Sequence, residues 1–406
     1  MKKHYFVIFC CVLFLFILSS CGRNQESIKT STEMLLYNTT ETKSLNADEN
    51  AKLISEHNRF LGGLQQRTTR IGDVLYYSQY GGKDLPMIFA VDLDTMEAFP
   101  LCGKPECEHK DKSCNAFAGK IGTFVQLSSA QDQLYYLDLC SPNHVVYRLQ
   151  ADGTERTEVA VLPNEYEVFT GGSDYTWFGI YKDQIVRCTC GDTMEENEIK
   201  KTAIYYVQPL DSSQEAQTEE IFRVENARKA LACLDGDILY CAVFQRSATD
   251  EMQLTIYSYR MDKKELEELY IGPAQIAQNM AVKSDRLIFS FGPCCYAFSL
   301  KDHTMKEICN GSFLYAGDDV ILCTEDDGSF RCLDYEGNLI YEGNVIPDEI
   351  EARGCGLNYA GCSDNIFYFL LSFSASPKGY GFLAVDTNSR SSELLFSVDL
   401  PEENLE

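Results

Sequence analysis

The sequence is poor in histidine, in tryptophan and in positive charge. Its 406 residues include 5 His and 1 Trp, so catalysis based on histidine has few candidate positions. No GxSxG, GxxxxGK[ST] or HExxH stretch occurs, which removes the usual signatures of α/β-hydrolases, P-loop proteins and zinc metalloproteases. Only 35 Lys and Arg face 61 Asp and Glu, a formal net charge of -26. Because nucleic acid and anionic lipid are bound by clustered Lys and Arg, we expect neither as an electrostatic partner.

Long apolar runs are also absent, except at the amino terminus. Lys2 and Lys3 precede an apolar stretch over residues 5–18, and small or polar residues follow at once. A helix that spans a bilayer needs about 20 apolar residues. The pattern therefore predicts a signal peptide over residues 1–20.

The signal ends in LSSCG, residues 18–22, which resembles the bacterial lipobox. The resemblance implies cleavage before Cys21, which would then carry diacylglycerol and further acyl chains such as palmitate; an ordinary secretory signal is the alternative. Two or three acyl chains suffice for a stable anchor. The polar residues 21–53 predict a flexible tether after the lipidated terminus. We therefore expect a protein held by lipid on the extracytoplasmic face of the cell membrane.

A short pattern recurs through the rest of the chain: Gly or Asp, a polar residue, then apolar or aromatic residues. The copies are GDVLYY, DQLYY, DQIV, GDILY, DRLIF, DDVIL and DNIFYF, starting at residues 72, 132, 183, 236, 285, 318 and 364. Each is followed by an aromatic strand and a turn rich in Asp, Gly, Asn and Ser, such as FAVDLDTME or YRLQADGTER. Such turns join antiparallel strands, so each unit reads as four strands, a to d.

Seven four-stranded units over residues 54–402 predict an all-β fold, a single β-propeller. We favour seven blades, while the short interval of 33 residues between the fifth and sixth copies leaves six or eight open. The repeats resemble the TolB-like and YWTD-type propellers of Gram-positive bacterial surface lipoproteins, over roughly residues 55–400. The turns here, such as AQDQ and LDGD, differ from the SPDG-like turn of TolB repeats.

The strand order separates the loops into two faces. The a–b and c–d turns are short and lie on one face, whereas the b–c loops and the connections between blades lie on the other. The second set is long and varied, and includes CTCGDTMEENEIKK and the insertion at residues 102–120. We expect function on that face, because rigid strands there present variable loops.

The insertion contains Cys102, Cys107, His109 and Cys114, in the spacing CxxxxCxHxxxxC. Three thiolates and an imidazole are the ligand set of a structural zinc site. Pro105 supports a tight turn between the first two cysteines. The alternatives are a disulfide among the three cysteines, which an extracytoplasmic location favours, or unrelated thiols.

Cysteine arithmetic weakens the disulfide alternative. The chain has 18 Cys; without Cys10, Cys11 and the acylated Cys21 an odd number remains, which cannot all pair. Cys233, Cys241, Cys323 and Cys332 lie in apolar strands and are expected to pack as small hydrophobic residues.

Weaker candidates accompany these cysteines. Cys140 and His144, in the second blade, are expected on the same face as the insertion, where they could supply a further ligand or a disulfide partner. Cys188 and Cys190 share one face of a strand. The pair Cys294-Cys295 follows Gly-Pro and is expected in a b–c turn.

These features favour a non-enzymatic lipoprotein whose propeller binds a glycan, peptide or protein partner, or serves as a scaffold in the cell envelope. The alternative is an envelope polysaccharide hydrolase or lyase with carboxylates at the mouth of the channel. Such an enzyme needs two opposed carboxylates. With 61 acidic residues the sequence selects no particular pair.

Overall fold

The computed structural model describes most residues between 68 and 399. The described ranges are 68–80, 86–95, 97–109, 113–118, 125–138, 144–162, 175–195, 198–210, 218–247, 249–277, 279–283, 285–291, 294–310, 313–317, 319–324, 329–343, 347, 350, 354–363, 365–373 and 379–399. The predicted signal peptide, Cys21 and the tether lie outside these residues. All described residues belong to one compact unit, Thr42–Glu406.

Seven antiparallel four-stranded sheets form the fold, and each uses four consecutive strands. Blade 1 contains β1 (Thr68–Ile71), β2 (Val74–Tyr80), β3 (Pro86–Asp92) and β4 (Glu97–Pro100); blade 2 contains β5 (Gln126–Ala130), β6 (Gln133–Asp138), β7 (His144–Gln150) and β8 (Arg156–Leu162). Blade 3 contains β9 (Tyr175–Tyr181), β10 (Gln184–Glu195), β11 (Glu198–Pro209) and β12 (Glu219–Glu225); blade 4 contains β13 (Ala227–Asp235), β14 (Ile238–Arg246), β15 (Met252–Arg260) and β16 (Glu265–Pro273). Blade 5 contains β17 (Asn279–Lys283), β18 (Arg286–Phe291), β19 (Cys294–Ser299) and β20 (Met305–Asn310). Blade 6 contains β21 (Phe313–Ala316), β22 (Val320–Thr324), β23 (Phe330–Asp334) and β24 (Leu339–Gly343); blade 7 contains β25 (Cys355–Ser363), β26 (Ile366–Phe373), β27 (Gly379–Asp386) and β28 (Ser391–Asp399).

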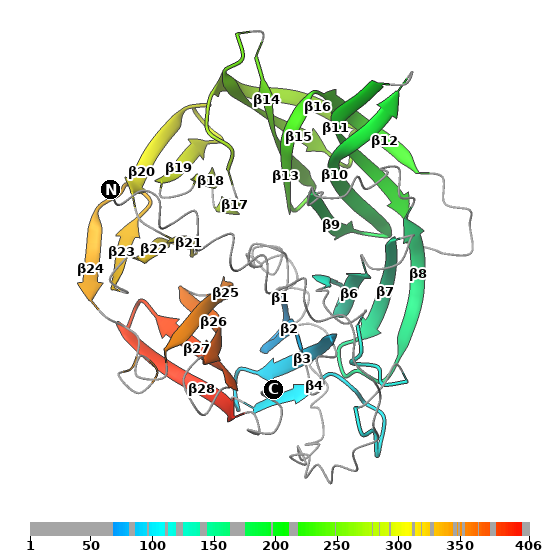
Figure 1. The fold of residues 1–406 in the computed structure, drawn as a ribbon, viewed down its shortest axis with the longest axis vertical. Coiled ribbons are helices and arrows are strands. Elements are labelled where there is room, and N and C mark those ends of the chain that lie inside the picture. The colour runs from blue at the N-terminus through cyan, green and yellow to red at the C-terminus, as the bar shows by residue number, and fades with distance from the viewer. Residues whose placement is uncertain are drawn as a thin grey trace, which may run out of the picture. The chain divides into compact units, whose positions relative to one another are not determined.

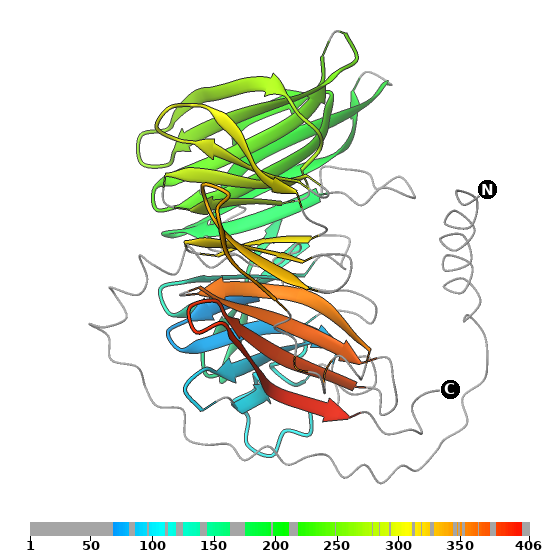
Figure 2. The ribbon, with the colours of Figure 1, turned by 90° about the vertical axis from the view of Figure 1, so that its left-hand side faces the viewer.

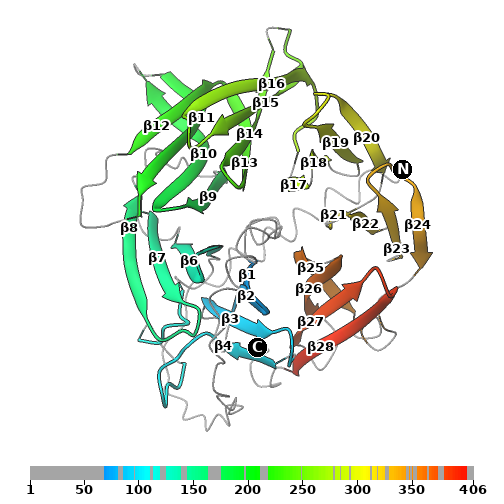
Figure 3. The ribbon, with the colours of Figure 1, turned by 180° about the vertical axis from the view of Figure 1, so that it is seen from behind.

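The seven sheets are arranged in a ring, with the first strand of each blade innermost and the fourth outermost (Figures 1 and 3). The prediction of an all-β propeller with seven blades is therefore confirmed. Among the described residues, no helix is long and apolar enough to span a membrane.

The recurring Gly and Asp pattern occupies the turn between the first two strands of a blade. Gly72, Asp132 and Gly236 have φ of 57°, 59° and 56° there, and Asn365 has 62°. Glycine, Asp and Asn tolerate this left-handed conformation better than other residues. The turn pattern therefore marked the blades correctly. The segment MDKKELEELY also follows its place in the repeat, because β16 begins at Glu265 after a short turn.

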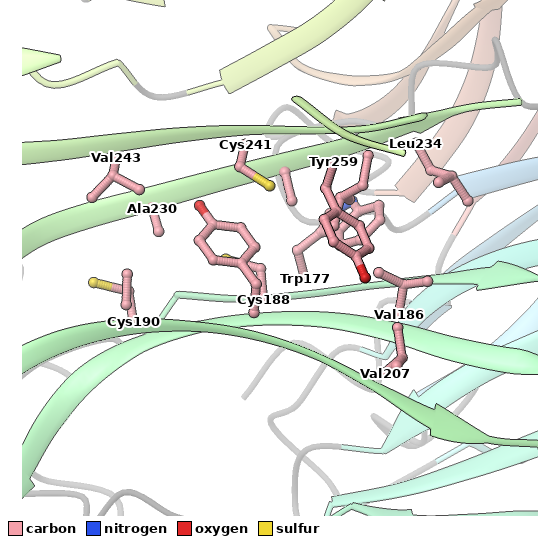
Figure 4. Close-up of a cluster of buried hydrophobic side chains, with 14 of the residues drawn as sticks. Trp177, Val186, Cys188, Cys190, Val207, Ala230, Leu234, Cys241, Val243 and Tyr259 are labelled. Carbon is pink, nitrogen blue, oxygen red and sulfur yellow. The ribbon is translucent and has the colours of Figure 1, made fainter. Parts of the chain in front are cut away.

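Neighbouring blades pack through buried apolar faces. Between blades 3 and 4, Figure 4 shows Cys188, Cys190 and Cys241 packed with Trp177 and Val243. The three cysteines are at most 1% exposed, and burial raises the pKa of Cys188 and of Cys241 well above the usual range. Of the four cysteines expected to pack as small hydrophobic residues, Cys241, Cys323 and Cys332 are completely buried, and Cys233 packs at the margin of a buried cluster.

Blades 1 and 7 close the ring through side-chain contacts, since no described sheet contains strands from both blades. The ring of Tyr77 on β2 stacks on that of Phe382 on β27, with centroids 5.5 Å apart. The Thr68 hydroxyl donates a hydrogen bond to the Ala360 carbonyl. Figure 2 shows blade 7, in orange and red, directly against blade 1, in blue.

Candidate metal centre

The Cys/His insertion interrupts the outermost strand of blade 1. The Leu101 N–H, just after β4, donates to the Ile88 carbonyl at 2.9 Å, while the Ile88 N–H donates to the Ala116 carbonyl at 2.8 Å. Phe117 then forms a bridge with Met87. The chain therefore leaves the sheet after Leu101 and returns to the same strand at Ala116.

The insertion lies between β4 of blade 1 and β5 of blade 2, as predicted, and the pairing of Ile88 adds that the outermost strand of blade 1 resumes before the chain passes to blade 2. Residues 102–115 emerge from the outer edge of blade 1, because Ile88 pairs with both ends of the segment. The connection to blade 2 begins only after the strand has resumed at Phe117.

The insertion lies on the turn between β7 and β8 of blade 2. The Gly103 N–H donates to the Gly153 carbonyl at 2.9 Å, and Asn115 Nδ2 donates to the same carbonyl at 2.8 Å and to that of Thr154 at 3.0 Å. From β8, the Arg156 guanidinium donates to the carbonyls of Cys114 and Phe117 at 3.2 and 2.6 Å. Hydrogen bonds thus hold both the beginning and the end of the insertion against blade 2.

The four side chains predicted as ligands lie together. Their ligand atoms, the sulfurs of Cys102, Cys107 and Cys114 and a ring nitrogen of His109, all lie within 4.8 Å of one another. His109 Nδ1 is 3.2 Å from Cys114 Sγ. A tetrahedral zinc ion with Zn–S bonds of about 2.3 Å places its sulfur ligands about 3.8 Å apart. The cluster can therefore hold a metal ion with small adjustments of the side chains.

A tight turn brings the first two cysteines together. The Cys107 N–H donates to the Lys104 carbonyl at 3.3 Å, Pro105 occupies the second position and Glu106 the third, with φ of 58°. Proline followed by a residue of positive φ is the pattern of a type II turn. The role predicted for Pro105 is confirmed.

Burial and nearby hydrogen bonds act in opposite directions on the thiols. Burial alone would raise the pKa of Cys102, but hydrogen bonds from the backbone of Lys104 and Asn115 outweigh it, and this pKa is lowered. Burial and the neighbouring Cys102 raise the pKa of Cys114 to about 12. Desolvation lowers the pKa of His109, which favours the neutral imidazole that binds metals. A bound cation would offset the repulsion between the thiolates.

The three cysteines of the insertion are unbonded, and none of the described cysteines forms a disulfide.

The weaker candidate residues named from the sequence do not join this cluster. His144 begins β7 and its Nδ1 lies 2.7 Å from Arg187 on β10, so His144 contacts blade 3 and not the insertion. Cys140 lies outside the described residues. Cys294 and Cys295 are the first two residues of β19, which corrects their assignment to a turn.

The variable-loop face carries a projecting hairpin in blade 3. Beyond the pair Cys190–Tyr175, β10 has no partner in β9, and β11 pairs with β12 only from Thr202 onward. Residues 192–195 and 198–201 therefore pair only with each other. The stretch CTCGDTMEENEIKK, expected as a loop, forms the end of two twelve-residue strands.

The innermost strands are poor in acidic residues. Across the first strand of every blade, all of which the structure describes, the one carboxylate belongs to Asp235, the last residue of β13. A pair of opposed carboxylates, as glycoside hydrolysis requires, is absent from these seven strands.

Comparison with solved structures finds similar folds within larger enzymes, two of them peptidases. A puromycin hydrolase mutant in complex with PGG is 12% identical, with a TM-score of 0.53 over 86% of this chain and 56% of that one. Prolyl endopeptidases are 13% identical, with a TM-score of 0.52 over 88% of this chain and 53% of theirs. An acylaminoacyl peptidase in complex with a peptidyl chloromethyl ketone is 10% identical, with a TM-score of 0.50 over 84% and 53%.

The chain is a seven-bladed β-propeller. At these identities the likeness concerns the fold alone, and the propeller chain spans little more than half the length of those enzymes. No family model matches the sequence. No curated protein matches it either.

Proposed function

We propose that this propeller is a binding or scaffold module, anchored by a lipid at Cys21 to the extracytoplasmic face of the cell membrane. Its partner is a glycan, a peptide or a protein of the envelope. The basic start, the apolar stretch 5–18 and LSSCG support the anchor. Replacement of Cys21 by Ala should abolish incorporation of labelled palmitate and release the protein from the membrane fraction. A variant that stays membrane-bound and labelled would contradict the anchor.

The proposal of a binding role, and not a hydrolytic one, rests mainly on the scarcity of carboxylates in the innermost strands. Asp235 is the one acidic residue of the seven innermost strands, so these strands offer no acid and base pair for hydrolysis. The β10–β11 hairpin meanwhile extends on the variable-loop face, where it can contact a large partner. Both features favour recognition over cleavage or elimination.

The binding role is tested by shortening this hairpin. Gly191 and Thr202 are directly paired, so residues 192–201 can be replaced by Asn-Gly, which closes antiparallel strands in a two-residue turn. Native envelope material and a glycan array are then probed with the original and shortened proteins. We expect a specific partner whose affinity falls by about tenfold or more on shortening, as for loss of an interface hot spot.

The matched control changes the opposite face. Asp262 and Lys263 lie in the exposed turn between β15 and β16, and their replacement by Ser should leave partner binding unchanged. Cleavage of an envelope polysaccharide by the purified protein, with no partner retained, would instead favour the alternative of a hydrolase or lyase.

We also propose that Cys102, Cys107, His109 and Cys114 hold one structural zinc ion. The donor set and the mutual distances within 4.8 Å support this assignment. Three thiolates donate strongly to the metal, so the ion would stabilise the insertion and not activate water. Protein purified without metal-affinity steps should contain about one zinc per chain.

The stabilising effect of zinc has a definite expected size. At a free zinc concentration 1,000 times the dissociation constant, binding adds about 4 kcal/mol to the free energy of unfolding. For about 330 residues, an unfolding entropy of roughly 0.7 kcal/mol/K converts this to a rise of about 6 °C in Tm. Cys107→Ala should abolish zinc binding and this rise, whereas Cys294→Ala, in β19, should keep both. Metal-free protein with a disulfide within the insertion would contradict the proposal.

A further inference from the structure

Three cysteines meet where blade 5 packs on blade 6. Cys295 on β19 lies directly opposite Cys309 on β20, and Cys323 lies on β22 of the next blade. The sulfurs of Cys309 and Cys323 are 3.5 Å apart. All three belong to one packed cluster, with Cys309 at its margin. A thiol of one blade therefore contacts a thiol of the neighbouring blade.

The three thiols differ in exposure. Cys295 and Cys323 are 1% and 0% exposed, whereas Cys309 is half-buried on the outermost strand of its blade. Hydrogen bonds from Cys295 and from Cys323 lower the pKa of Cys309, with a smaller contribution from Arg331, which is paired with Cys323. Reactive cysteines are typically partly exposed thiolates that have a second thiol within reach.

The cysteines in the core between blades 3 and 4 provide a contrast. Cys188 and Cys241 are completely buried and their pKa values are raised, so they remain inert thiols. Cys309 combines access to solvent with two adjacent thiols that stabilise its anion.

We propose that Cys309 is an oxidisable thiol that reacts with small-molecule disulfides and then forms a disulfide with Cys323, which joins blades 5 and 6. The Cys309 thiolate attacks one sulfur of the small disulfide, forms a mixed disulfide and releases the other half as a thiolate. The Cys323 thiol then attacks the Cys309 sulfur and expels the second half, which takes up the Cys323 proton and leaves as a thiol. Two protein thiols are oxidised while one small-molecule disulfide is reduced to two thiols.

The geometry requires little movement. Bonded sulfurs lie about 2.05 Å apart, so the two atoms must approach by roughly 1.5 Å. Cys309 is one residue from the end of its strand, and Cys323 is one residue from the end of β22. Strand ends can adjust by this amount without disturbing the rest of either sheet.

The test exposes the reduced, zinc-loaded protein to oxidised glutathione, blocks the remaining thiols and maps the tryptic peptides. Cleavage after Lys306 and Arg331 leaves Cys309 and Cys323 within the single peptide 307–331, whereas Cys295 lies in peptide 287–301. We expect peptide 307–331 with an internal disulfide. A link between the two peptides, or no disulfide at Cys309, would overturn the proposal.

Variants separate the two steps. Cys323→Ala should accumulate glutathione on Cys309, and Cys309→Ala should form neither product. Cys294→Ala, which removes a half-buried thiol beside Cys295, should behave as the original protein.

A measurement on the unaltered chain keeps the test independent of how well these variants fold. At pH 7, alkylation of Cys309 should be about tenfold faster than that of Cys294, because an ordinary thiol is only slightly ionised at this pH. Equal rates at the two positions would overturn the proposal.

Discussion

Replacement of Gly153 by Ala tests how the insertion is held on blade 2. Gly153 lies in the turn between β7 and β8 with φ of +72°, and a Cβ atom there would stand 2.7 Å from both the Cys102 nitrogen and the Leu101 carbonyl carbon. These are backbone atoms at the base of the insertion, which cannot rotate away as a flexible side chain would. The substitution must therefore displace the insertion or the turn.

A second glycine isolates the effect of this close approach. Gly236 has φ of +56°, and a Cβ atom there would meet nothing within 4 Å. Both substitutions carry the cost of a left-handed alanine, about 1–2 kcal/mol. Only Gly153→Ala adds the steric overlap of the new Cβ atom with the backbone of Leu101 and Cys102. This overlap should cost about 1–3 kcal/mol more, as for overpacking in a core.

The assay is thermal unfolding of the two variants in the same buffer with excess zinc. With an unfolding entropy of roughly 0.7 kcal/mol/K for about 330 residues, Gly153→Ala should melt roughly 1.5–4 °C below Gly236→Ala. Gly153→Ala should also bind zinc more weakly, since Cys102 must move, while Gly236→Ala should bind it normally. Equal melting temperatures and equal zinc affinities would refute the close contact between the insertion and blade 2.

Three further changes probe other contacts. Asn115→Ala removes the amide that donates to the carbonyls of Gly153 and Thr154 and should cost about 1 kcal/mol in chemical unfolding, whereas an unchanged midpoint would contradict the contact. Tyr335→Phe removes a buried hydroxyl that donates to the Gly317 carbonyl at 2.6 Å, and should cost about 1 kcal/mol with the fold intact by circular dichroism. Desolvation, with the charge of Arg187, lowers the pKa of His144 from 6.5 to about 4, so the unfolded chain binds more protons between these values and stability falls as the pH drops from 6.5 towards 4. With partial exposure discounted, the loss should be on the order of 1–2 kcal/mol, and it should be absent in His144→Gln.

Local signals in the sequence were sufficient to predict the seven-bladed architecture. The Gly or Asp turn followed by an aromatic strand depends on backbone preferences within a few residues, so it located all seven blades. The clustering of Cys102, Cys107, His109 and Cys114 was also predictable, because they lie close together in the sequence and a type II turn shortens the distance between the first two.

Features that depend on strand pairing were not predictable. The polar stretch after Cys190 was expected as a loop, yet it forms strands because each half pairs with the other. The position of the insertion depends on Ile88, which bonds to both of its ends. No local signal in the sequence marks Cys309, since its contact with Cys323 depends on the packing of two blades.

The proposed metal site is also connected to the closure of the ring. Cys114, Ala116 and Phe117 belong to the same buried cluster as Tyr77 and Phe382, which joins blade 1 to blade 7. Polar contacts hold the same segment to blade 2. Because the described strands of blades 1 and 7 share no sheet, the order of this segment affects the contacts of blade 1 with both of its neighbours. Loss of a bound metal should therefore weaken the junction of blades 1 and 7, and not only the loop that carries the ligands.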